Sequence, residues 1–144
     1  MEYVTYLNPV ALQVQSMVAR KARIIEDGPL CRRNDFVGFF DASRREMSIC
    51  TSRIKAVSPW DYSRLINETL LHESVHVAQA CKDRAGYLKP LGIRRASMPL
   101  SPGRKADLRK ALGYDSSLGH IEHEAYFMED KPKLVLHVLN KYCF

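Results

Sequence analysis

At its centre the sequence reads Thr69-Leu-Leu-His-Glu-Ser-Val-His-Val-Ala78, in which two histidines four residues apart stand in a run with one charged residue. Residues four apart on a helix face the same side, so the imidazoles of His72 and His76 can reach one metal ion. Glu73 lies about 100° round the helix, where it can meet a metal-bound water but is badly placed as a ligand. The run therefore predicts two zinc ligands and a general base on one helix.

The residues before this run predict a β-hairpin and then a long helix. Ser58-Pro-Trp-Asp61 combines a capping serine, a proline at the first helical position and an acid, so the helix is expected over residues 59–82. Residues 36–40 and 47–51 have the composition and alternation of strands, and they flank the polar residues 41–46. We therefore expect these two strands to form a hairpin just before the helix.

The rest of the chain predicts further helices and one more strand. Residues 3–7 alternate enough to form a short strand, and the glycines and prolines of residues 86–100 indicate a loop. Four more helices are expected: from Pro9, capped by Asn8 and ending by Gly28; from Pro102, closed by Gly113; from Asp115 or Ser116, stopping before Pro132; and over residues 134–142. Five helices and a small, mostly antiparallel sheet give an α+β fold. A chain of 144 residues, 46% of them hydrophobic, is expected to form a single domain, residues 1–144.

The charge balance gives no strong indication of a partner. Lysine and arginine number 22 against 16 acids, a net charge of +6, but the basic residues come in scattered pairs. Without a basic stripe interleaved with aromatics, we expect a solvated surface and no nucleic-acid partner. No apolar run approaches the ~18 residues of a membrane span, and Met1-Glu2-Tyr3 lacks the basic start of a signal peptide. A soluble, non-secreted, cytoplasmic protein with no membrane partner is therefore expected.

The redox state of the four cysteines stays open. Cys31, Cys50, Cys81 and Cys143 form no Cys-x-x-Cys pair, so a cysteine zinc knuckle is not expected. In a reducing cytosol they would be free thiols. In an oxidising compartment they would form two disulfides by any of three pairings, and the sequence does not choose among them.

A second polar stretch, Gly119-His-Ile-Glu-His-Glu-Ala-Tyr126, supplies candidates for the third ligand that a catalytic zinc site needs beside an open position for water. Glu122 shares a helix side with Tyr126, whereas Glu124 shares one with His120. Since residues two apart on a helix point about 200° apart, only one of the two acids can face the histidine pair. Four side chains of this stretch are candidate ligands: His120, Glu122, His123 and Glu124.

The histidine pair, followed far downstream by a helical Glu-x-x-Ala at Glu122 and Ala125, resembles the gluzincin branch of the zincin metallopeptidases. Its surroundings are similar to those in the mitochondrial metallopeptidases that process an ATP-synthase subunit, and small phage-encoded metallopeptidases are similar too. Three stretches carry this similarity: Gly38-Phe-Phe-Asp41, Ile49-Cys-Thr-Ser-Arg-Ile54 and Cys81-Lys82. The resemblance covers residues 36–82 and 119–126.

The resemblance implies a minimal zincin-like domain, with residues 86–113 as an insertion between its two metal-bearing helices. The implied zinc ligands are His72, His76 and Glu122, and the implied catalytic base is Glu73. The family places an alanine three residues after its third ligand, which favours Glu122 over the glutamate two positions later.

Several positions depart from the family pattern. Ala42 replaces a turn proline, Ser52 replaces a strand asparagine, and Gln79 replaces an aspartate three residues beyond the second histidine. Tyr126 stands where the family has an acid, so a carboxylate partner for a ligating histidine must come from elsewhere in the chain. The zinc chemistry therefore carries over, whereas the choice of substrate does not.

The predicted function is zinc-dependent hydrolysis of a peptide bond in a protein or peptide substrate. Zn²⁺ would lower the pKa of its bound water to about 7, and Glu73 would take the proton and pass it to the leaving amine. Tyr126 is the predicted oxyanion donor, with His120 and His123 as alternatives. Residues 47–51 are the predicted pairing partner of an extended substrate.

Two alternatives stand beside this prediction. The first is a zincin-like protein without catalytic activity, structural or virion-associated, in which zinc is a staple and the basic surface contacts nucleic acid or a capsid. The second is a metal-dependent hydrolase of a non-peptide amide. A phage-encoded chain would act in the host cytoplasm or the virion, in association with a larger phage assembly. The intact Glu73 favours an enzyme.

Overall fold

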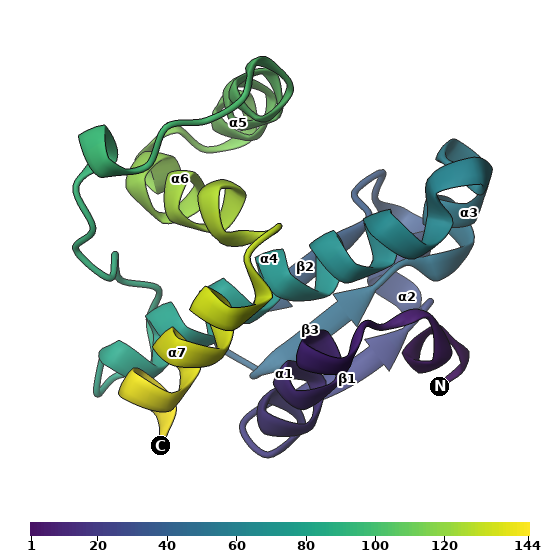
Figure 1. Cartoon of the computed structure of the whole chain (residues 1–144), viewed down its shortest axis with the longest axis horizontal. Helices are drawn as coiled ribbons and strands as arrows, with labels where there is room; N and C mark the ends of the chain where they lie inside the picture. The colour runs from purple at the N-terminus through teal and green to yellow at the C-terminus, as the bar shows by residue number, and fades with distance from the viewer.

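The histidine-bearing run lies in α4 (Tyr62–Lys82), which spans 21 residues and is the central element of the fold (Figure 1). Residues 69–80 are all buried, because other helices and the sheet pack around this helix. A helix buried on every side tolerates few charges, which explains the uncharged residues that flank His72 and His76. Of the described helices, neither α4 nor any other is long and apolar enough to cross a membrane.

The computed structural model describes the backbone of residues 1–144 and the side chains of all of them except Tyr114. In this described chain seven α-helices accompany a three-stranded sheet, which confirms the predicted α+β class. The other helices are α1 (Pro9–Ala19), α2 (Pro29–Arg33), α3 (Thr51–Val57), α5 (Pro102–Tyr114), α6 (Gly119–Met128) and α7 (Pro132–Cys143). The strands are β1 (Arg23–Glu26), β2 (Gly38–Asp41) and β3 (Glu46–Ile49). Short 3-10 helices cover Glu2–Tyr6, Pro59–Asp61, Arg95–Ser97 and Ser116–Leu118.

The sheet has the strand order β1-β3-β2, with β3 in the centre. β2 and β3 pair antiparallel, with Phe40 opposite Met47, which confirms the predicted hairpin. β1 pairs with β3 in parallel, with Ile24 opposite Met47, so the sheet is mixed and the prediction of a mostly antiparallel sheet is wrong. The periodicity predicts a helix through residue 25, whereas pairing with β3 holds residues 23–26 extended.

The N-terminus is helical where the alternation predicts a strand. Glu2–Tyr6 forms a 3-10 helix. Within it, Tyr3 is fully buried and donates a hydrogen bond to Gln15 Oε1 at 2.8 Å. Burial of this aromatic ring therefore outweighs the short alternating pattern of residues 3–7.

The structure confirms some of the predicted helix boundaries and contradicts others. The predicted cap at Asn8 is confirmed, since its Oδ1 accepts from the Ala11 N–H, and the helix predicted from Pro102 is capped by Ser101 Oγ, which accepts from the Arg104 N–H. In contrast α1 ends at Ala19, well before Gly28, and α4 begins after the 3-10 turn of residues 59–61. Ser58, the predicted cap, makes no side-chain cap hydrogen bond. α2 and α3 come in addition to the five predicted helices, because each is a short helix between longer elements.

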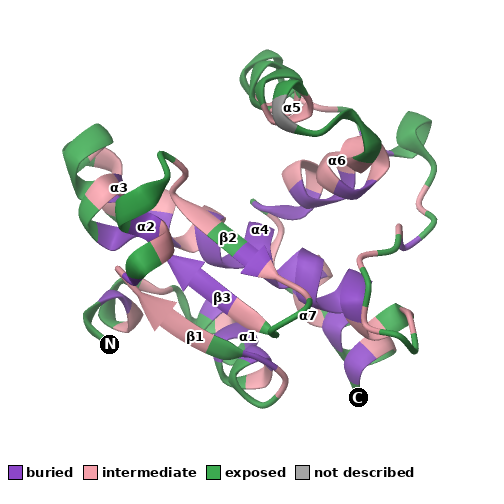
Figure 2. Cartoon of the chain, turned by 180° about the vertical axis from the view of Figure 1, so that it is seen from behind, coloured by how far each residue is buried: buried purple, intermediate pink, exposed green. Residues whose placement is uncertain are grey.

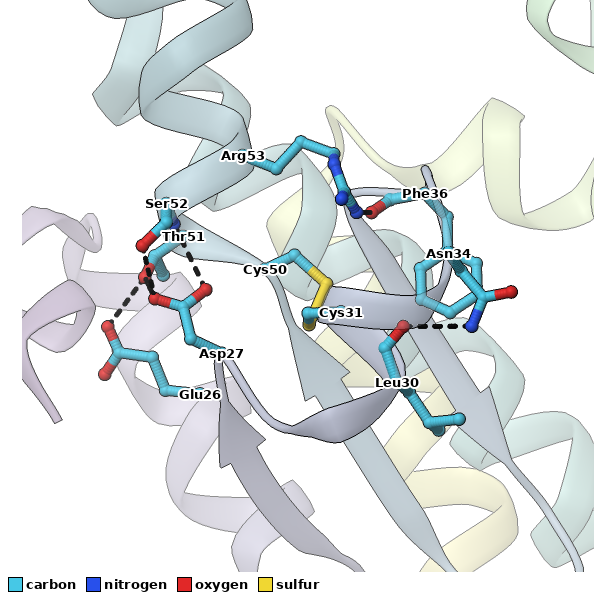
Figure 3. Close-up of a disulfide and its surroundings, with 10 residues drawn as sticks. All are labelled: Glu26, Asp27, Leu30, Cys31, Asn34, Phe36, Cys50, Thr51, Ser52 and Arg53. Carbon is cyan, nitrogen blue, oxygen red and sulfur yellow. Dashed lines mark hydrogen bonds between the residues drawn. A yellow bond between two sulfur atoms is a disulfide. The ribbon is translucent and has the colours of Figure 1, made fainter.

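Two disulfides join the cysteines, Cys31 to Cys50 and Cys81 to Cys143. The first ties α2 to the junction of β3 and α3 (Figure 3), and the second ties the ends of α4 and α7. Figure 3 also shows Asp27, whose carboxylate accepts hydrogen bonds from the backbone N–H and the hydroxyl of Ser52 at the start of α3. Of the three cysteine pairings that the sequence allows, the structure therefore has the one that joins Cys31 to Cys50 and Cys81 to Cys143. Disulfides persist in oxidising compartments, so this pairing does not favour the cytoplasmic location predicted above.

The segment that joins α4 to α6 folds largely outside the hydrophobic core. The core lies among α1, α4, α7 and the sheet, and it includes none of the described residues of α5. α5 packs on α6 and is otherwise exposed to solvent (Figure 2). Residues 86–113 thus form the predicted loop and short helix at the periphery of the molecule, with a 3-10 turn at residues 95–97.

Candidate metal centre

Two packed helices, α4 and α6, bring together the three side chains predicted as ligands. His72, His76 and Glu122 each offer a donor atom, and these atoms lie within 4.8 Å of one another. Glu122 Oε1 lies 2.6 Å from His76 Nε2, and Glu122 Oε2 lies 3.3 Å from His72 Nε2. The spacing of four residues on α4 therefore turns both Nε2 atoms toward one carboxylate on α6.

The other ring nitrogen of His72 is held by a carboxylate outside the predicted site, that of Glu129. His72 Nδ1 lies 2.9 Å from Glu129 Oε1, and both side chains are buried. Glu129 follows the last residue of α6, seven positions after Glu122, and therefore on the same side of the helix. The spacing of seven residues from Glu122 is the signal in the sequence that indicates Glu129. Glu129 thus supplies the carboxylate partner of His72, a role for which the resembled family has an acid at the position of Tyr126.

The other ring nitrogen of His76 is held by Gln79, where the resembled family has aspartate. Gln79 Nε2 donates to the Ile121 carbonyl at 3.0 Å and to Glu124 Oε1 at 2.9 Å. Because the amide nitrogen faces these two acceptors, Gln79 Oε1 must accept the Nδ1–H of His76, at 2.7 Å. In the neutral ring the Nε2 lone pair then points to the candidate metal site.

Charge and burial oppose each other in this cluster. Burial alone would lower the pKa of His72, but its contacts with Glu122 and Glu129 outweigh burial and raise that pKa well above its usual value. The pKa of His76 is raised in the same way, chiefly by Glu122. Burial would raise the pKa of Glu122, but the two imidazoles hold it well below its usual range. A carboxylate between two imidazoles is a site where a dication can replace bound protons.

Glu73 lies beside the cluster and is not part of it. Glu73 is only 7% exposed. Among the described side chains, none forms a hydrogen bond or an ion pair with its carboxylate. Burial raises its pKa, against the opposing effect of His72 and His76. A Cβ atom at Gly38 on β2 would lie 3.3 Å from Glu73 Oε2 and 2.6 Å from a methyl carbon of Thr69, so a glycine is needed for this close approach.

Tyr126 packs its ring against the first histidine. The ring centroids of Tyr126 and His72 are 4.5 Å apart, with an interplanar angle of 69°. Burial, with Glu122 next in importance, raises the pKa of Tyr126, so its hydroxyl stays protonated at neutral pH. Its place beside the cluster agrees with the predicted side of the helix, and its role as oxyanion donor stays a prediction.

The remaining candidates of the second stretch point away from the cluster and hold the loop of residues 86–100. Glu124 is fully buried and accepts hydrogen bonds from the backbone N–H groups of residues 91–93. His120 and His123 contact backbone carbonyls of the same loop through Nε2, at 2.7 and 2.8 Å. Among the described side chains, neither Glu124 nor His120 therefore joins His72 and His76, so these residues do not form a closed zinc site of three histidines and one glutamate.

The edge of the sheet near the cluster is β2. The prediction that residues 47–51 pair with an extended substrate is wrong, because β3 is the central strand and already pairs with β1 and β2. β2 pairs with β3 alone and carries Gly38 directly beside Glu73. An added strand at this end of the sheet would therefore have to pair with β2.

The chain belongs to the family described as "Domain of unknown function (DUF8637)", which matches residues 3–144. No curated protein and no solved structure matches the chain. The resemblance to gluzincin metallopeptidases therefore stays an inference from the residues quoted for it.

Proposed function

We propose that this protein is a zinc-dependent metallopeptidase of the gluzincin type. The observation that carries the proposal is the convergence of His72, His76 and Glu122, with the buried carboxylate of Glu73 beside them. The histidine motif alone is also compatible with two histidines that only form hydrogen bonds and bind no metal. The addition of a carboxylate from a second helix gives the three-ligand set of a catalytic zinc site.

The donor set fits zinc in its chemistry as well as its number. Two imidazole nitrogens and one carboxylate oxygen are the ligands of well-known zinc peptidases, which keep a fourth position open. Both imidazoles have an acceptor at Nδ1, Glu129 for His72 and Gln79 for His76. Such partners fix the ring orientation of metal-binding histidines. No fourth protein ligand is found among the described side chains at this cluster, which supports a catalytic over a closed structural site.

The chemistry then follows from the placement of the side chains. Bound zinc supplies a water of pKa about 7 and polarises a carbonyl. Glu73 takes a proton from the attacking water and returns it to the leaving amine, as its position beside the ligands allows. Tyr126 contributes its protonated hydroxyl to the oxyanion that forms.

The substrate that fits this arrangement is an extended peptide. A segment that adds to the free edge of β2 runs past Gly38 and therefore past Glu73. Phe39 on the same strand is 41% exposed and stacks on Phe36 at 5.2 Å between ring centroids. This aromatic pair offers an apolar contact to a substrate side chain.

The test has a metal arm and an activity arm. Native protein that has met no chelator should contain about one zinc per chain, and His72→Ala should lose it, while His137→Ala, at an exposed histidine of α7, should not. Glu73→Gln should keep zinc and lose cleavage of a mixed peptide library. Zinc that is equal in wild type and His72→Ala contradicts the metal site. If the wild type holds zinc but cleaves no peptide, the structural alternative is favoured. If it instead hydrolyses a non-peptide amide, and Glu73→Gln does not, the second alternative, a hydrolase of non-peptide amides, is favoured.

A further inference from the structure

We propose that Arg104 of α5 is a positioning residue for the metal site, acting through Glu129 on His72. The inference rests on the proposed function, since it concerns the same site. It assigns a role to the segment between α4 and α6, which lies largely outside the core and supplies none of the proposed ligands.

The carboxylate of Glu129 has a different partner on each oxygen. Its Oε1 lies 2.9 Å from His72 Nδ1, and its Oε2 forms an ion pair with Arg104 Nε at 3.2 Å, in which the buried Nε–H makes no hydrogen bond. Both contacts are shielded from water, because the Glu129 side chain is 11% exposed and the Arg104 side chain 21%. One carboxylate therefore links a cation on α5 to a ligand on α4.

The guanidinium of Arg104 is also contacted by a carboxylate of α4 and by one in the turn between α6 and α7. Its NH2 donates to Glu68 Oε1 on α4 at 2.8 Å, and its NH1 lies 3.6 Å from Asp130 Oδ2. Glu68 is held in turn by Arg64, at 2.9 Å. The planar fork of arginine presents several donors in a fixed geometry, whereas lysine offers a point charge on a flexible stem. Arg104 is therefore a fixed group against which Glu129 is oriented.

Glu129 needs such a partner for two reasons. It is the C-cap residue of α6, at the end of the helix, where regular hydrogen bonding stops. It also shares the neighbourhood of Glu68, and two buried carboxylates repel each other unless a cation lies between them. Without Arg104, the carboxylate of Glu129 would turn away from Glu68 and leave the Nδ1 of His72 without a fixed acceptor.

Metal affinity tests this chain of contacts. Arg104→Leu should weaken the affinity for Co²⁺ or Zn²⁺, measured by competition with a chelator, by about 10–100-fold, the usual cost of losing a partner of a ligand. Arg64→Leu is the matched control, because it removes a cation from Glu68 and leaves Glu129 untouched. It should keep the wild-type affinity. In a Glu129→Gln background, Arg104→Leu should have no further effect.

A readout on the metal-free protein separates this inference from the proposed function. The Nδ1–H resonance of His72 in the proton NMR spectrum should be lost or shifted in Arg104→Leu and kept in Arg64→Leu. Arg104→Lys, which keeps the charge, should fall between wild type and Arg104→Leu and serves if the latter fails to fold. Equal effects of the two leucine substitutions, or additive losses with Glu129→Gln, overturn the role of Arg104. Wild-type protein that binds no metal overturns the proposed function, while the resonance still decides the contact.

Discussion

The two glutamates of α6 offer the sharpest test of the geometry, because they are two residues apart and have opposite tasks. Glu122 faces the histidines, whereas Glu124 is fully buried and holds the loop of residues 86–100. We therefore expect Glu122→Gln to cost metal affinity and Glu124→Gln to cost stability. Both substitutions preserve size and remove one charge, so each is the control for the other.

The magnitude for Glu124→Gln follows from its hydrogen bonds. Glu124 Oε1 accepts from Gln79 Nε2 and from the Leu91 N–H, at 2.9 and 2.8 Å. Glu124 Oε2 accepts from the N–H groups of Gly92 and Ile93, at 3.0 and 3.3 Å. Whichever oxygen becomes the amide nitrogen, two donors lose their acceptor; those to Oε1 are buried and those to Oε2 are partly buried. At about 1–3 kcal/mol for each, the free energy of unfolding should fall by about 2–6 kcal/mol.

Thermal unfolding of the metal-free proteins measures this loss. For a chain of this length, the expected change lowers the Tm by about 10 °C or more in Glu124→Gln. Glu122→Gln should shift the Tm less and should lose metal by orders of magnitude in a chelator titration. A Glu124→Gln protein with the wild-type Tm would refute the hydrogen-bond network, and a larger affinity loss in Glu124→Gln than in Glu122→Gln would refute the ligand assignment.

Further predictions concern the histidine partner, the disulfides and high pH. Gln79→Leu should weaken metal binding by about 10–100-fold in the same titration, and unchanged affinity would show that the amide does not orient its histidine. Cys143→Ser should lower the free energy of unfolding in urea by about 4 kcal/mol and Cys31→Ser by about 3 kcal/mol. The reason is that their disulfides close separations of 62 and 19 residues. A larger loss in Cys31→Ser than in Cys143→Ser would contradict this dependence on loop length. Burial, opposed by a hydrogen bond to Gln15, raises the pKa of Tyr3 to about 12. Stability should therefore be full below the unfolded pKa of ~10 and fall as pH rises through 12, a loss that Tyr3→Phe should lack in thermal scans.

The parts of the site that depend on one helix could be predicted from the sequence. The shared side of His72 and His76 follows from helical geometry alone, and α4 has that geometry. The same geometry shows that Glu122 and Glu124 face apart, but which one meets α4 depends on how α6 is rotated against it. That rotation is a tertiary property, so the choice needed the family resemblance.

The parts that depend on contacts between distant segments could not be predicted. Residues 23–26 continue the apolar periodicity of α1, and only pairing with β3 makes them a strand. That added strand also moves β3 from the edge to the centre, which is why the predicted substrate strand is wrong. The role proposed for Arg104 depends on where α5 folds, and the sequence gives no periodic signal for that position.

The side-chain amide of Gln79 on α4 connects the candidate site to the loop of residues 86–100, because it contacts both His76 and Glu124. Gln79 accepts from His76 through its oxygen and donates to Glu124 through its nitrogen. Glu124 in turn holds the backbone N–H groups of residues 91–93. Displacement of this loop would leave the carboxylate of Glu124 without its three backbone donors. It would thereby loosen one of the two acceptors that fix the amide of Gln79, the other being the Ile121 carbonyl. A chain with an intact histidine motif and a disordered loop should therefore bind metal more weakly, because the proposed ligands would be present but less well oriented.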